Sequence, residues 1–401
     1  MMKGYLRKDG RKGIRNLVLV VYLVECAHHV AAEIVRQGNL NHVHLIGFSG
    51  CAPNKYAANM MKMLCTHPNV GGILLVSLGC ENLRSEELES LIRESGRPVR
   101  SIIIQKVGGT AHAVNLGKWY LNQVVTEAEK NVTKTDLSFS DLVIGTICGG
   151  SDATSGITAN PAVGLVFDEL RDEGATCIFE EPGELIGCEY LLADRARDES
   201  LAFRLLETIR KAARYYEKMG HDSFSEGNGA GGLTTIEEKS LGSYCKSGSS
   251  RIDGIIYPGE LPPVPGLYLM DVVPDGEVKW GFPNLNDNAE IIEMIASGAH
   301  LILFTTGRGS VVGSAISPVI KICANPQTYE MLSDDMDINA GKIILGQADI
   351  FDISWKIIEA IKDICTGVPS KSEKLGHREF VLGYKSFDEA FRCGEVGNMR
   401  K

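Results

Sequence analysis

Cysteine is the residue type whose placement in this sequence first suggests chemistry. The chain holds 11 cysteines, and four of them follow, within three residues, apolar runs that predict buried strands. These four are Cys26, Cys51, Cys80 and Cys148; the last three stand beside glycine, which leaves the sulfur atom reachable. Because ligands bind outside the carboxyl ends of parallel strands, we expect these thiols to meet at one edge of a sheet.

Carboxylates accompany the same strand ends. Glu81 directly follows Cys80, and Glu181 directly follows a strand predicted over Cys177–Glu180. Three thiolates with a carboxylate can hold one ferrous ion, or three corners of an iron–sulfur cluster that keeps one iron open. A thiol-lined pocket without metal is the alternative. Zinc is disfavoured, because structural zinc ligands usually come as close pairs and the sequence has no Cys-x-x-Cys.

Basic side chains gather at two candidate anion sites. Arg7 lies in a basic opening segment, and Arg15-Asn16 directly precedes a predicted buried strand, where unpaired charge is costly. Guanidinium groups bind carboxylates with two hydrogen bonds, so either an acidic substrate or a structural ion pair explains this placement. Farther along, Thr305–Ser310 (TTGRGS) follows another predicted strand, which favours an anion-binding loop with Arg308 as its charge.

Two glycine-rich segments are candidate ligand loops. Gly108–Thr110 precedes a predicted helix, where it either exposes amides to an anion or simply caps the helix through Thr110. Residues 227–232 (GNGAGG) satisfy GxGxxG, but a polar loop precedes them instead of a strand, so we predict no dinucleotide site. The following TTIEEKS segment starts like a helix with a capping-box pattern, and Lys239 lies one turn inside it.

The elements that must position these residues alternate between strand and helix. Continuous apolar runs separated by helix-compatible stretches predict βαβ units around a parallel sheet. A polar, turn-rich stretch at His221–Gly232 is taken as the domain boundary. We therefore predict an α/β protein: a parallel-sheet βαβ first domain over residues 1–225, and a second, smaller α/β domain over 226–401 that completes the active site. The predicted strands are Leu17–Val24, His44–Phe48, Gly72–Leu78, Ser101–Ile104, Leu142–Ile147, Cys177–Glu180, Leu267–Val272, His300–Phe304 and Lys342–Leu345.

Composition narrows the class of protein. The net charge of −10 and the lack of a long basic run argue against a nucleic-acid partner. No segment reaches the roughly 18–20 apolar residues of a membrane span, and the start lacks the apolar core of a signal peptide. We expect a cytoplasmic protein without disulfides, whose partner is an acidic small molecule.

Taken together, the cysteine-bearing, arginine-bearing and glycine-rich segments described above resemble the altronate/galactarate dehydratase family, and the resemblance extends over nearly the whole chain. The resemblance implies an enzyme that dehydrates sugar acids to 2-keto-3-deoxy acids and depends on iron, with manganese as a second expected metal. The large subunit of a sulfolactate sulfo-lyase is similar to this family too. The motifs that carry the resemblance are residues 4–16 (GYLRKDGRKGIRN), His67–Glu81, Cys148–Gly164, Ala230–Gly242, Phe304–Ser310 and Asp334–Ile344.

The resemblance also implies roles for individual residues. Lys239 and Asp152 are the expected acid–base residues. The expected metal ligands are Cys51, Cys80 and Cys148, with Glu81 or Glu181 as oxygen donors. The expected substrate contacts are Arg7, Arg15, Asn16, Thr110, Ser151 and Arg308.

The expected reaction is β-elimination from a 2-hydroxy acid. Arginines hold the carboxylate, a base removes the adjacent proton, and the metal takes up the departing hydroxyl. The alternatives are the large subunit of a sulfolactate sulfo-lyase and a non-catalytic iron or iron–sulfur carrier subunit. Family dehydratases often carry a small N-terminal domain before this region, so we expect a separate small subunit, and a homo-oligomer. Gly229 stands where the family commonly has lysine, which changes the charge offered to the substrate.

Overall fold

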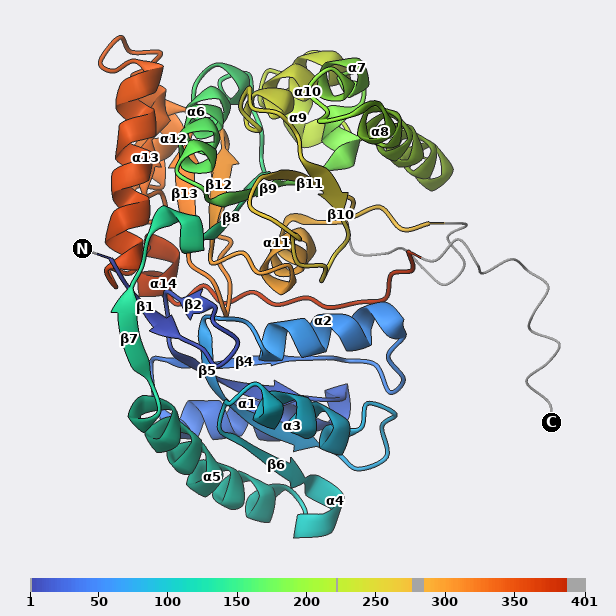
Figure 1. Cartoon of the computed structure of the whole chain (residues 1–401), viewed down its shortest axis with the longest axis vertical. Coiled ribbons are helices and arrows are strands. Elements are labelled where there is room, and N and C mark those ends of the chain that lie inside the picture. Colours follow the sequence, from blue (N-terminus) through green and yellow to red (C-terminus); the bar gives the residue numbers. More distant parts are fainter. Residues whose placement is uncertain (1, 221–222, 276–284, 388–401) are drawn as a thin grey trace, which may run out of the picture.

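The fold consists of two α/β halves, which lie one above the other in Figure 1. The computed structural model describes residues 2–220, 223–275 and 285–387. Each half is built on its own parallel sheet, which confirms the predicted α/β class. No helix among these residues is long and apolar enough to cross a membrane.

The first half is a four-stranded sheet in the order β4-β3-β5-β6. Alternate residues of β3 lie on opposite faces: Val18 and Val20 share a hydrophobic cluster with residues of α1 and α5, whereas Leu19 and Val21 share one with residues of α2 and α3. Both faces are therefore covered, which is why the strand reads as a continuous apolar run. The elements are β3 (Leu17–Tyr22), α1 (Glu25–Gly38), β4 (Val43–Gly47), α2 (Lys55–Cys65), β5 (Val70–Ser77), α3 (Ser85–Glu94), β6 (Val99–Ile103), α4 (Ile104–Val107) and α5 (Thr110–Lys130).

The second half is a seven-stranded sheet in the order β10-β11-β9-β8-β12-β13-β14, parallel throughout. Its strands are β8 (Val143–Cys148), β9 (Thr176–Phe179), β10 (Gly254–Ile256), β11 (Leu267–Met270), β12 (Leu301–Thr306), β13 (Val319–Cys323) and β14 (Ile338–Asn339). Its helices are α6 (Ala159–Asp172), α7 (Glu189–Ala193), α8 (Glu199–Met219), α9 (Glu226–Ala230), α10 (Ile236–Cys245), α11 (Asp287–Ala296), α12 (Pro326–Met331), α13 (Ile350–Cys365) and α14 (Lys371–Leu375).

The predicted division at residue 225 falls inside this second sheet. Strands β8 and β9 precede that residue, while β10 to β14 follow it, and β11 pairs directly with β9. The expectation that all the cysteine-bearing strands share one sheet edge is wrong, because β3, β4 and β5 lie in the other sheet from β8. Apolar runs predict buried parallel strands, but they carry no information about which strands pair.

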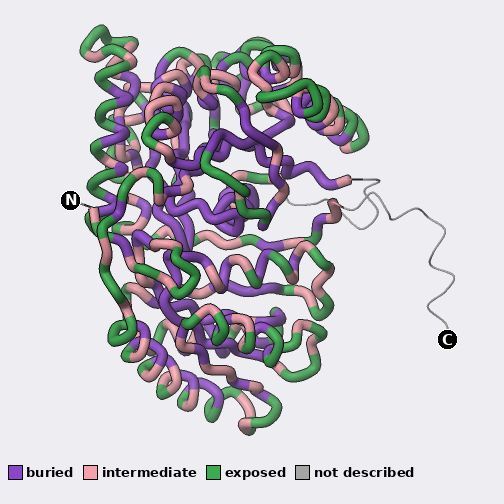
Figure 2. Tube along the Cα trace, in the orientation of Figure 1, coloured by how far each residue is buried: buried purple, intermediate pink, exposed green. Residues whose placement is uncertain are grey.

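Helix α11 joins the two halves (Figure 1). It is buried over every residue from Ala289 to Ala296, as the purple tube in the middle of Figure 2 shows. A helix that is buried on all sides is enclosed by other elements, although α11 also carries two buried glutamates, Glu290 and Glu293. Here one hydrophobic cluster runs from α2 and β4 of the first half through α11 to β12 of the second. The two halves thus share a core.

Near the C-terminus the structure differs from the sequence prediction at two places: one predicted strand is not formed, and one strand was not predicted. Lys342–Leu345, predicted as a strand, is wrong: a 3-10 turn at Ala340–Lys342 runs directly into further turns. Strand β13 was missed because Lys321 interrupts its apolar run, yet this lysine is fully buried within the strand. A short buried element with one charge in it lacks the pattern by which strands are recognised.

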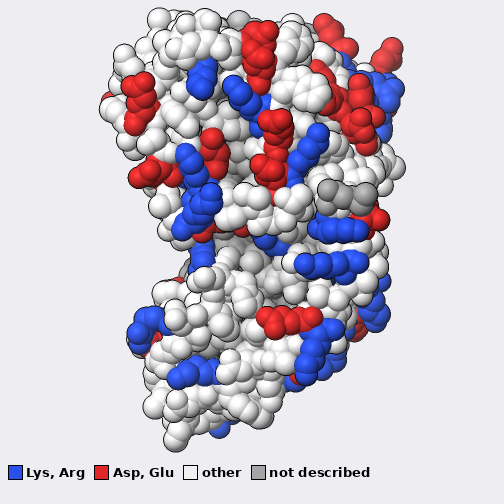
Figure 3. All heavy atoms as spheres, turned by 90° about the vertical axis from the view of Figure 1, so that its left-hand side faces the viewer, with Lys and Arg blue, Asp and Glu red and all other residues white. Residues whose placement is uncertain are grey.

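A small antiparallel sheet, β2-β1-β7, lies where the halves meet; its strands are β1 (Lys3–Leu6), β2 (Lys12–Gly13) and β7 (Thr133–Asp136). On the face drawn in Figure 3 the surface is hollowed between the halves, and acidic and basic side chains are interspersed. The acidic excess of the chain is not gathered on this face. Part of it is internal, because Glu180, Glu290 and Glu293 are buried.

Candidate active site

Acidic and sulfur-bearing side chains converge where β8 and β9 end. Cys148 is the last residue of β8, and Glu180 and Glu181 directly follow β9. Glu184 lies one turn farther on, in the 3-10 helix Pro182–Leu185. Adjacent parallel strands end at the same edge, so the pairing of β8 with β9 brings these groups together.

Cys148 is at the centre of this group and is buried. Its Sγ lies 2.8 Å from Glu184 Oε2 and 3.4 Å from Glu181 Oε2, and its backbone N–H donates to Glu181 Oε2 at 3.1 Å. Burial raises the pKa of the Cys148 thiol well above its usual range, and both carboxylates raise it further. The sulfur is therefore a thiol that donates to Glu184, and not a free thiolate.

One face of α10 delivers two ammonium groups and a hydroxyl. Lys239, Ser243 and Lys246 are spaced four and three residues apart, so they lie in a row along the helix. Lys239 Nζ is 2.6 Å from Glu184 Oε1, and Ser243 Oγ donates to Glu184 Oε2 at 2.9 Å. Lys246 Nζ pairs with Glu181, and it lies 3.2 Å from the Cys148 sulfur.

The local charges push the pKa values of the acidic groups apart. Burial alone would raise the pKa of Glu184, but Lys239 and Lys246 outweigh it and lower that pKa to about 2. Burial and then Glu184 raise the pKa of Glu181 to about 7. The same two causes raise the pKa of Asp287 to about 6. Such separation of neighbouring pKa values is typical of sites that move protons.

Lys239 is held as an ammonium. Burial lowers its pKa, but the nearby carboxylates, Glu184 above all, act against this, and the pKa is raised above its ordinary value. Its Nζ also donates to the backbone carbonyl of Ser223 at 2.9 Å. Because Lys239 is protonated, it carries a proton that it can donate and a charge that stabilises anions, and it is not available as a base.

Glu181 has an unusual backbone. Its φ of 71° and ψ of 58° lie in the left-handed region, which costs a residue with a side chain roughly 1–2 kcal/mol. The contacts of its carboxylate with Lys246 and with the Cys148 amide hold it there. Strain of this kind persists where surrounding contacts fix it, and it concentrates at functional sites.

Three loops meet beside this cluster, and each was singled out from the sequence. Arg308 N–H donates to Gly150 O at 2.8 Å, and Arg308 Nη1 donates to Gly227 O at 2.6 Å. The Asn228 side chain donates to Ser151 O at 3.3 Å. The structure thus brings Ser151 and Arg308 to the same rim of the site, with Ser151 buried and Arg308 exposed.

Asp152 lies in the same junction, but its oxygens are engaged. Oδ1 accepts hydrogen bonds from Thr154 and Ser155, and Oδ2 accepts one from Asn325 at 3.0 Å. Gly307 packs against the carboxylate so closely that no Cβ would fit there. Asp152 therefore ties the loops together.

The structure does not bring Cys51 and Cys80 to the Cys148 group. Both are exposed, at the ends of β4 and β5 in the other sheet. Glu81 accepts hydrogen bonds from the amides of Gly79 and Cys80, which closes a local turn. Among the described residues, the groups spaced to hold a metal are Cys148 with Glu181 and Glu184, and Glu180 with Glu181 and Glu290.

The N-terminal arginines have structural partners. Arg15 forms an ion pair with Glu373 at 2.8 Å, so the structural alternative foreseen for this residue is the one observed. Arg7 donates to Pro68 O, Arg15 O and Asn16 Oδ1, and Asn16 in turn donates to Ala128 O. These contacts fasten the start of the chain to both halves.

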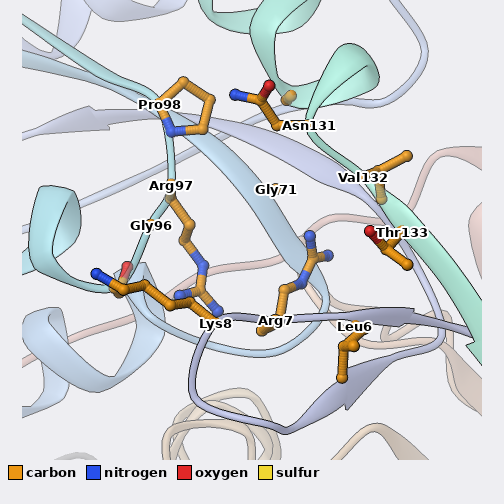
Figure 4. Close-up of a pocket in the computed structure, with 12 residues that line it drawn as sticks. Leu6, Arg7, Lys8, Gly71, Gly96, Arg97, Pro98, Asn131, Val132 and Thr133 are labelled. Carbon is orange, nitrogen blue, oxygen red and sulfur yellow. The ribbon is translucent and has the colours of Figure 1, made fainter.

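A cavity of about 320 Å³ lies beside these arginines (Figure 4). Arg7, Lys8 and Arg97 line it, at the start of the chain and next to β6. Thr110 is exposed on the first turn of α5, and Gly109 occupies the capping position instead, so the predicted Thr110 cap is wrong by one residue. A smaller cavity of about 110 Å³ borders the carboxylates, and Glu181, Glu184, Asp287 and Glu290 line it.

Sequence reasoning missed several members of the cluster. Lys246 could have been found from its spacing, because it lies seven residues after Lys239, on the same helical face. Asp287 and Glu290 stand in the first turn of α11, far along the chain from β9. No local pattern connects them to Glu180; only the tertiary contact does.

Comparison with known sequences decides the family. The sequence model of the D-galactarate/altronate dehydratase C-terminal domain matches residues 139–387. The model of the second domain of D-galactarate dehydratase/altronate hydrolase matches residues 4–129. The chain belongs to the D-galactarate/altronate dehydratase family. The two matched regions correspond to the two sheets, and the carboxylate cluster lies wholly within the C-terminal one.

Relatives with named activities match along most of the chain. The (2R)-sulfolactate sulfo-lyase subunit beta of Chromohalobacter salexigens is 32% identical over 390 residues, which cover 94% of this chain and 96% of the relative. Galactarate dehydratase (L-threo-forming) of Escherichia coli is 33% identical, covering 91% of this chain and 72% of that protein. Altronate dehydratase of Bacillus subtilis is 29% identical, covering 95% and 77%. Dehydratases are hydro-lyases, so this is a family of enzymes.

Proposed function

We propose that this protein is a hydro-lyase that eliminates water from a small sugar acid, of the altronate or galactarate type, to give a 2-keto-3-deoxy acid. Family membership supports the reaction class. The observation that carries the proposal is the buried Lys239–Glu184 pair at 2.6 Å, beside a cavity at the ends of parallel strands. Such a pair can hold a proton ready next to a bound substrate.

The reaction needs a base and an acid on one substrate. Asp287 lines the cavity, and its pKa of about 6 suits a residue that takes up a proton near neutral pH. Asp287 removes the proton next to the substrate carboxylate, and Lys239 gives its proton to the departing hydroxyl, which leaves as water. The enol that remains rearranges to the 2-keto acid, so atoms and charges balance.

The substrate carboxylate requires a positive partner. Arg308 stands on the rim, exposed, with one guanidinium nitrogen on Gly227 O and further donors directed elsewhere. Gly149, in the neighbouring loop, packs directly against the Asp287 carboxylate, where a Cβ would clash with Oδ2. In this proposal Arg308 binds the carboxylate, and Lys246 offsets the negative charge that develops as the proton leaves.

Iron, which the family resemblance implies, can be tested against the donors present. An iron–sulfur cluster needs three thiolates, and the described residues offer only Cys148 at this site. The donor set therefore does not fit a cluster. It fits a single ion, since carboxylates predominate, and a bound divalent ion would polarise the leaving hydroxyl as a Lewis acid.

A substrate screen with two readouts tests the proposal. The protein is incubated with altronate, galactarate or (2R)-sulfolactate, and 2-keto acid and sulfite are measured. We expect 2-keto-3-deoxy acid from a sugar acid, and Lys239→Met should lower kcat by about 10²–10⁴-fold. Glu237→Gln, an exposed change on the same helix, is the matched control and should leave turnover unchanged.

The other outcomes assign the alternatives. Sulfite release from sulfolactate without sugar-acid turnover would show a sulfo-lyase, which the 32% identity to subunit beta of that enzyme makes the second candidate. If the metal-loaded protein turns over none of these substrates, the remaining alternative is a non-catalytic iron or iron–sulfur carrier subunit. Equal kcat for Lys239→Met and the unchanged protein would remove Lys239 from the mechanism.

A further inference from the structure

Glu180 is a buried carboxylate without a partner. Its side chain is 0% exposed, and among the described residues neither oxygen has a hydrogen-bond partner. Burying an ionised group without compensation is among the costliest arrangements in a protein. No described residue satisfies this group, whereas a proton or a bound ion would.

Two further carboxylates face Glu180. Oxygen atoms of Glu180, Glu181 and Glu290 all lie within 4.8 Å of one another. Glu180 and Glu181 come from the end of β9, and Glu290 comes from the first turn of α11. A cation placed about 2.1–2.4 Å from each oxygen can span such separations.

The surrounding charges leave this group short of positive charge. Six acidic side chains and three lysines act on one another in this region, so the acids outnumber the bases by three. Lys239 pairs with Glu184, Lys246 pairs with Glu181, and Lys385 pairs with Glu293. Among the residues that the structure describes, no lysine is therefore ion-paired with Glu180, Asp287 or Glu290. Either protons or a cation must neutralise them.

The adjacent cavity gives a small ion room and access. It measures about 110 Å³, and Glu181 and Glu290 are in its wall together with Glu184 and Asp287. Water in such a polar cavity can complete the coordination of an ion held by three carboxylates. A proton needs no such space.

The neighbouring group of Cys148, Glu181 and Glu184 is less suited to a cation. The Lys246 ammonium already lies 3.2 Å from the sulfur and 3.9 Å from Glu184, and it pairs with Glu181. A second positive charge there would meet the first at close range. In the all-oxygen group on the other side of Glu181, the ion pairs of Lys246 reach Glu181 but neither Glu180 nor Glu290 among the described contacts.

We propose that Glu180, Glu181 and Glu290 bind one divalent cation of the oxygen-preferring class, such as Mg²⁺ or Mn²⁺. The site differs from the cysteine ligand set expected from the sequence, because it contains no sulfur. It is defined by binding alone, so it stands whether or not the protein proves to be a hydro-lyase. Glu181 belongs to both groups and would connect the ion to the proton-transfer cluster.

Mn²⁺ binding to the metal-stripped full chain tests this site. Free Mn²⁺ gives a sharp solution EPR signal that disappears on binding, so the bound fraction is counted directly. We expect one Mn²⁺ per chain, and at least about tenfold weaker binding in Glu180→Gln and Glu290→Gln. Glu293→Gln is the matched control, because Glu293 is buried on α11 like Glu290 but pairs with Lys385. The Glu293→Gln variant should keep the Mn²⁺ affinity within about threefold.

A second measurement keeps the test valid if a variant folds poorly. In excess EDTA, Glu180→Gln should melt at a higher temperature than the unchanged protein, since it removes an uncompensated buried charge. Added Mn²⁺ should raise the melting temperature of the unchanged protein and not that of Glu180→Gln. No Mn²⁺ binding by the unchanged protein, or equal binding by all variants, would overturn the proposal and leave protons as the neutralising groups.

Discussion

Lys246→Met is the substitution whose effect follows most directly from the site. Lys246 is fully buried, and its Nζ contacts Cys148 Sγ at 3.2 Å, Glu184 Oε2 at 3.9 Å and the Glu181 carboxylate. Methionine has a similar length and no charge, so it fills the space while removing the counter-ion. The carboxylates then remain buried without it.

The expected loss of stability is about 3–5 kcal/mol, the usual cost of removing one partner from a buried ion pair. The Coulomb energy agrees in size, because two unit charges about 4 Å apart attract by about 4 kcal/mol at an effective dielectric constant of 20. The pKa of Lys246 points the same way. Burial lowers it, but the carboxylates of Glu181 and Glu184 act against this, and it is raised well above its ordinary value.

Urea unfolding at pH 7 in excess EDTA measures this loss, and Lys321→Met is the matched control. Lys321 is also fully buried, yet burial lowers its pKa and its nearest carboxylate, on Asp335, lies 3.8 Å away. Losing a charge that its surroundings disfavour should change the free energy of unfolding by less than about 1 kcal/mol. The contrast separates charge pairing from the loss of a lysine.

A double substitution adds a further check. If Lys246 serves mainly as counter-ion to Glu181, Glu181→Gln should recover about 1–3 kcal/mol of the loss in the Lys246→Met background. A Lys246→Met protein within 1 kcal/mol of the unchanged one would refute the reasoning. So would equal losses for Lys246→Met and Lys321→Met.

Three other predictions follow from the structure. Burial lowers the pKa of His300 to about 4 from 6.5, so its neutral ring contributes its full stability above about pH 6.5. As the pH falls, the unfolded chain takes up the proton before the folded one does. The free energy of unfolding therefore drops by about 3 kcal/mol by about pH 4. His300→Gln should flatten that part of the curve of unfolding free energy against pH, and an unchanged slope would contradict it. Arg15→Met should lower the free energy of unfolding by about 1–3 kcal/mol through loss of the Glu373 pair while leaving KM unchanged; a raised KM with normal stability would instead indicate a substrate contact. Cys51→Ser and Cys80→Ser should each keep the Mn²⁺ stoichiometry of the unchanged protein, measured by EPR, and loss of the ion in either would place sulfur in the site.

Local sequence determined most of the elements. The apolar run over Leu17–Val24 predicted β3, and helices such as α8 follow from their apolar spacing and from the Asp198 side chain, which caps the first turn. These features depend on residues close together in the chain. The exceptions are elements such as β13, where a buried lysine breaks the pattern and distant partners supply the stabilisation.

The candidate site was predicted only in part, because some of its signals are local in the sequence and others are not. The end of a strand is a local signal, so the sequence pointed to Cys148 and Glu181, which the structure brings together; their roles, like that of Lys239, stay predictions. The set of partners was not local. Cys51 and Cys80 end strands just as Cys148 does, but they belong to a different sheet.

The sequence by itself determined the fold class, the family motifs and the residue types from which a proton-transfer site could be built. Only the tertiary structure decided which of them meet. Strand pairing set β8 beside β9, and α11 brought Glu290 to Glu180 across more than a hundred residues. The physical reason is that hydrogen bonds between strands and burial between helices are long-range contacts. A thiol-rich metal site expected from the sequence thus becomes, in space, a carboxylate cluster with a single cysteine at its centre.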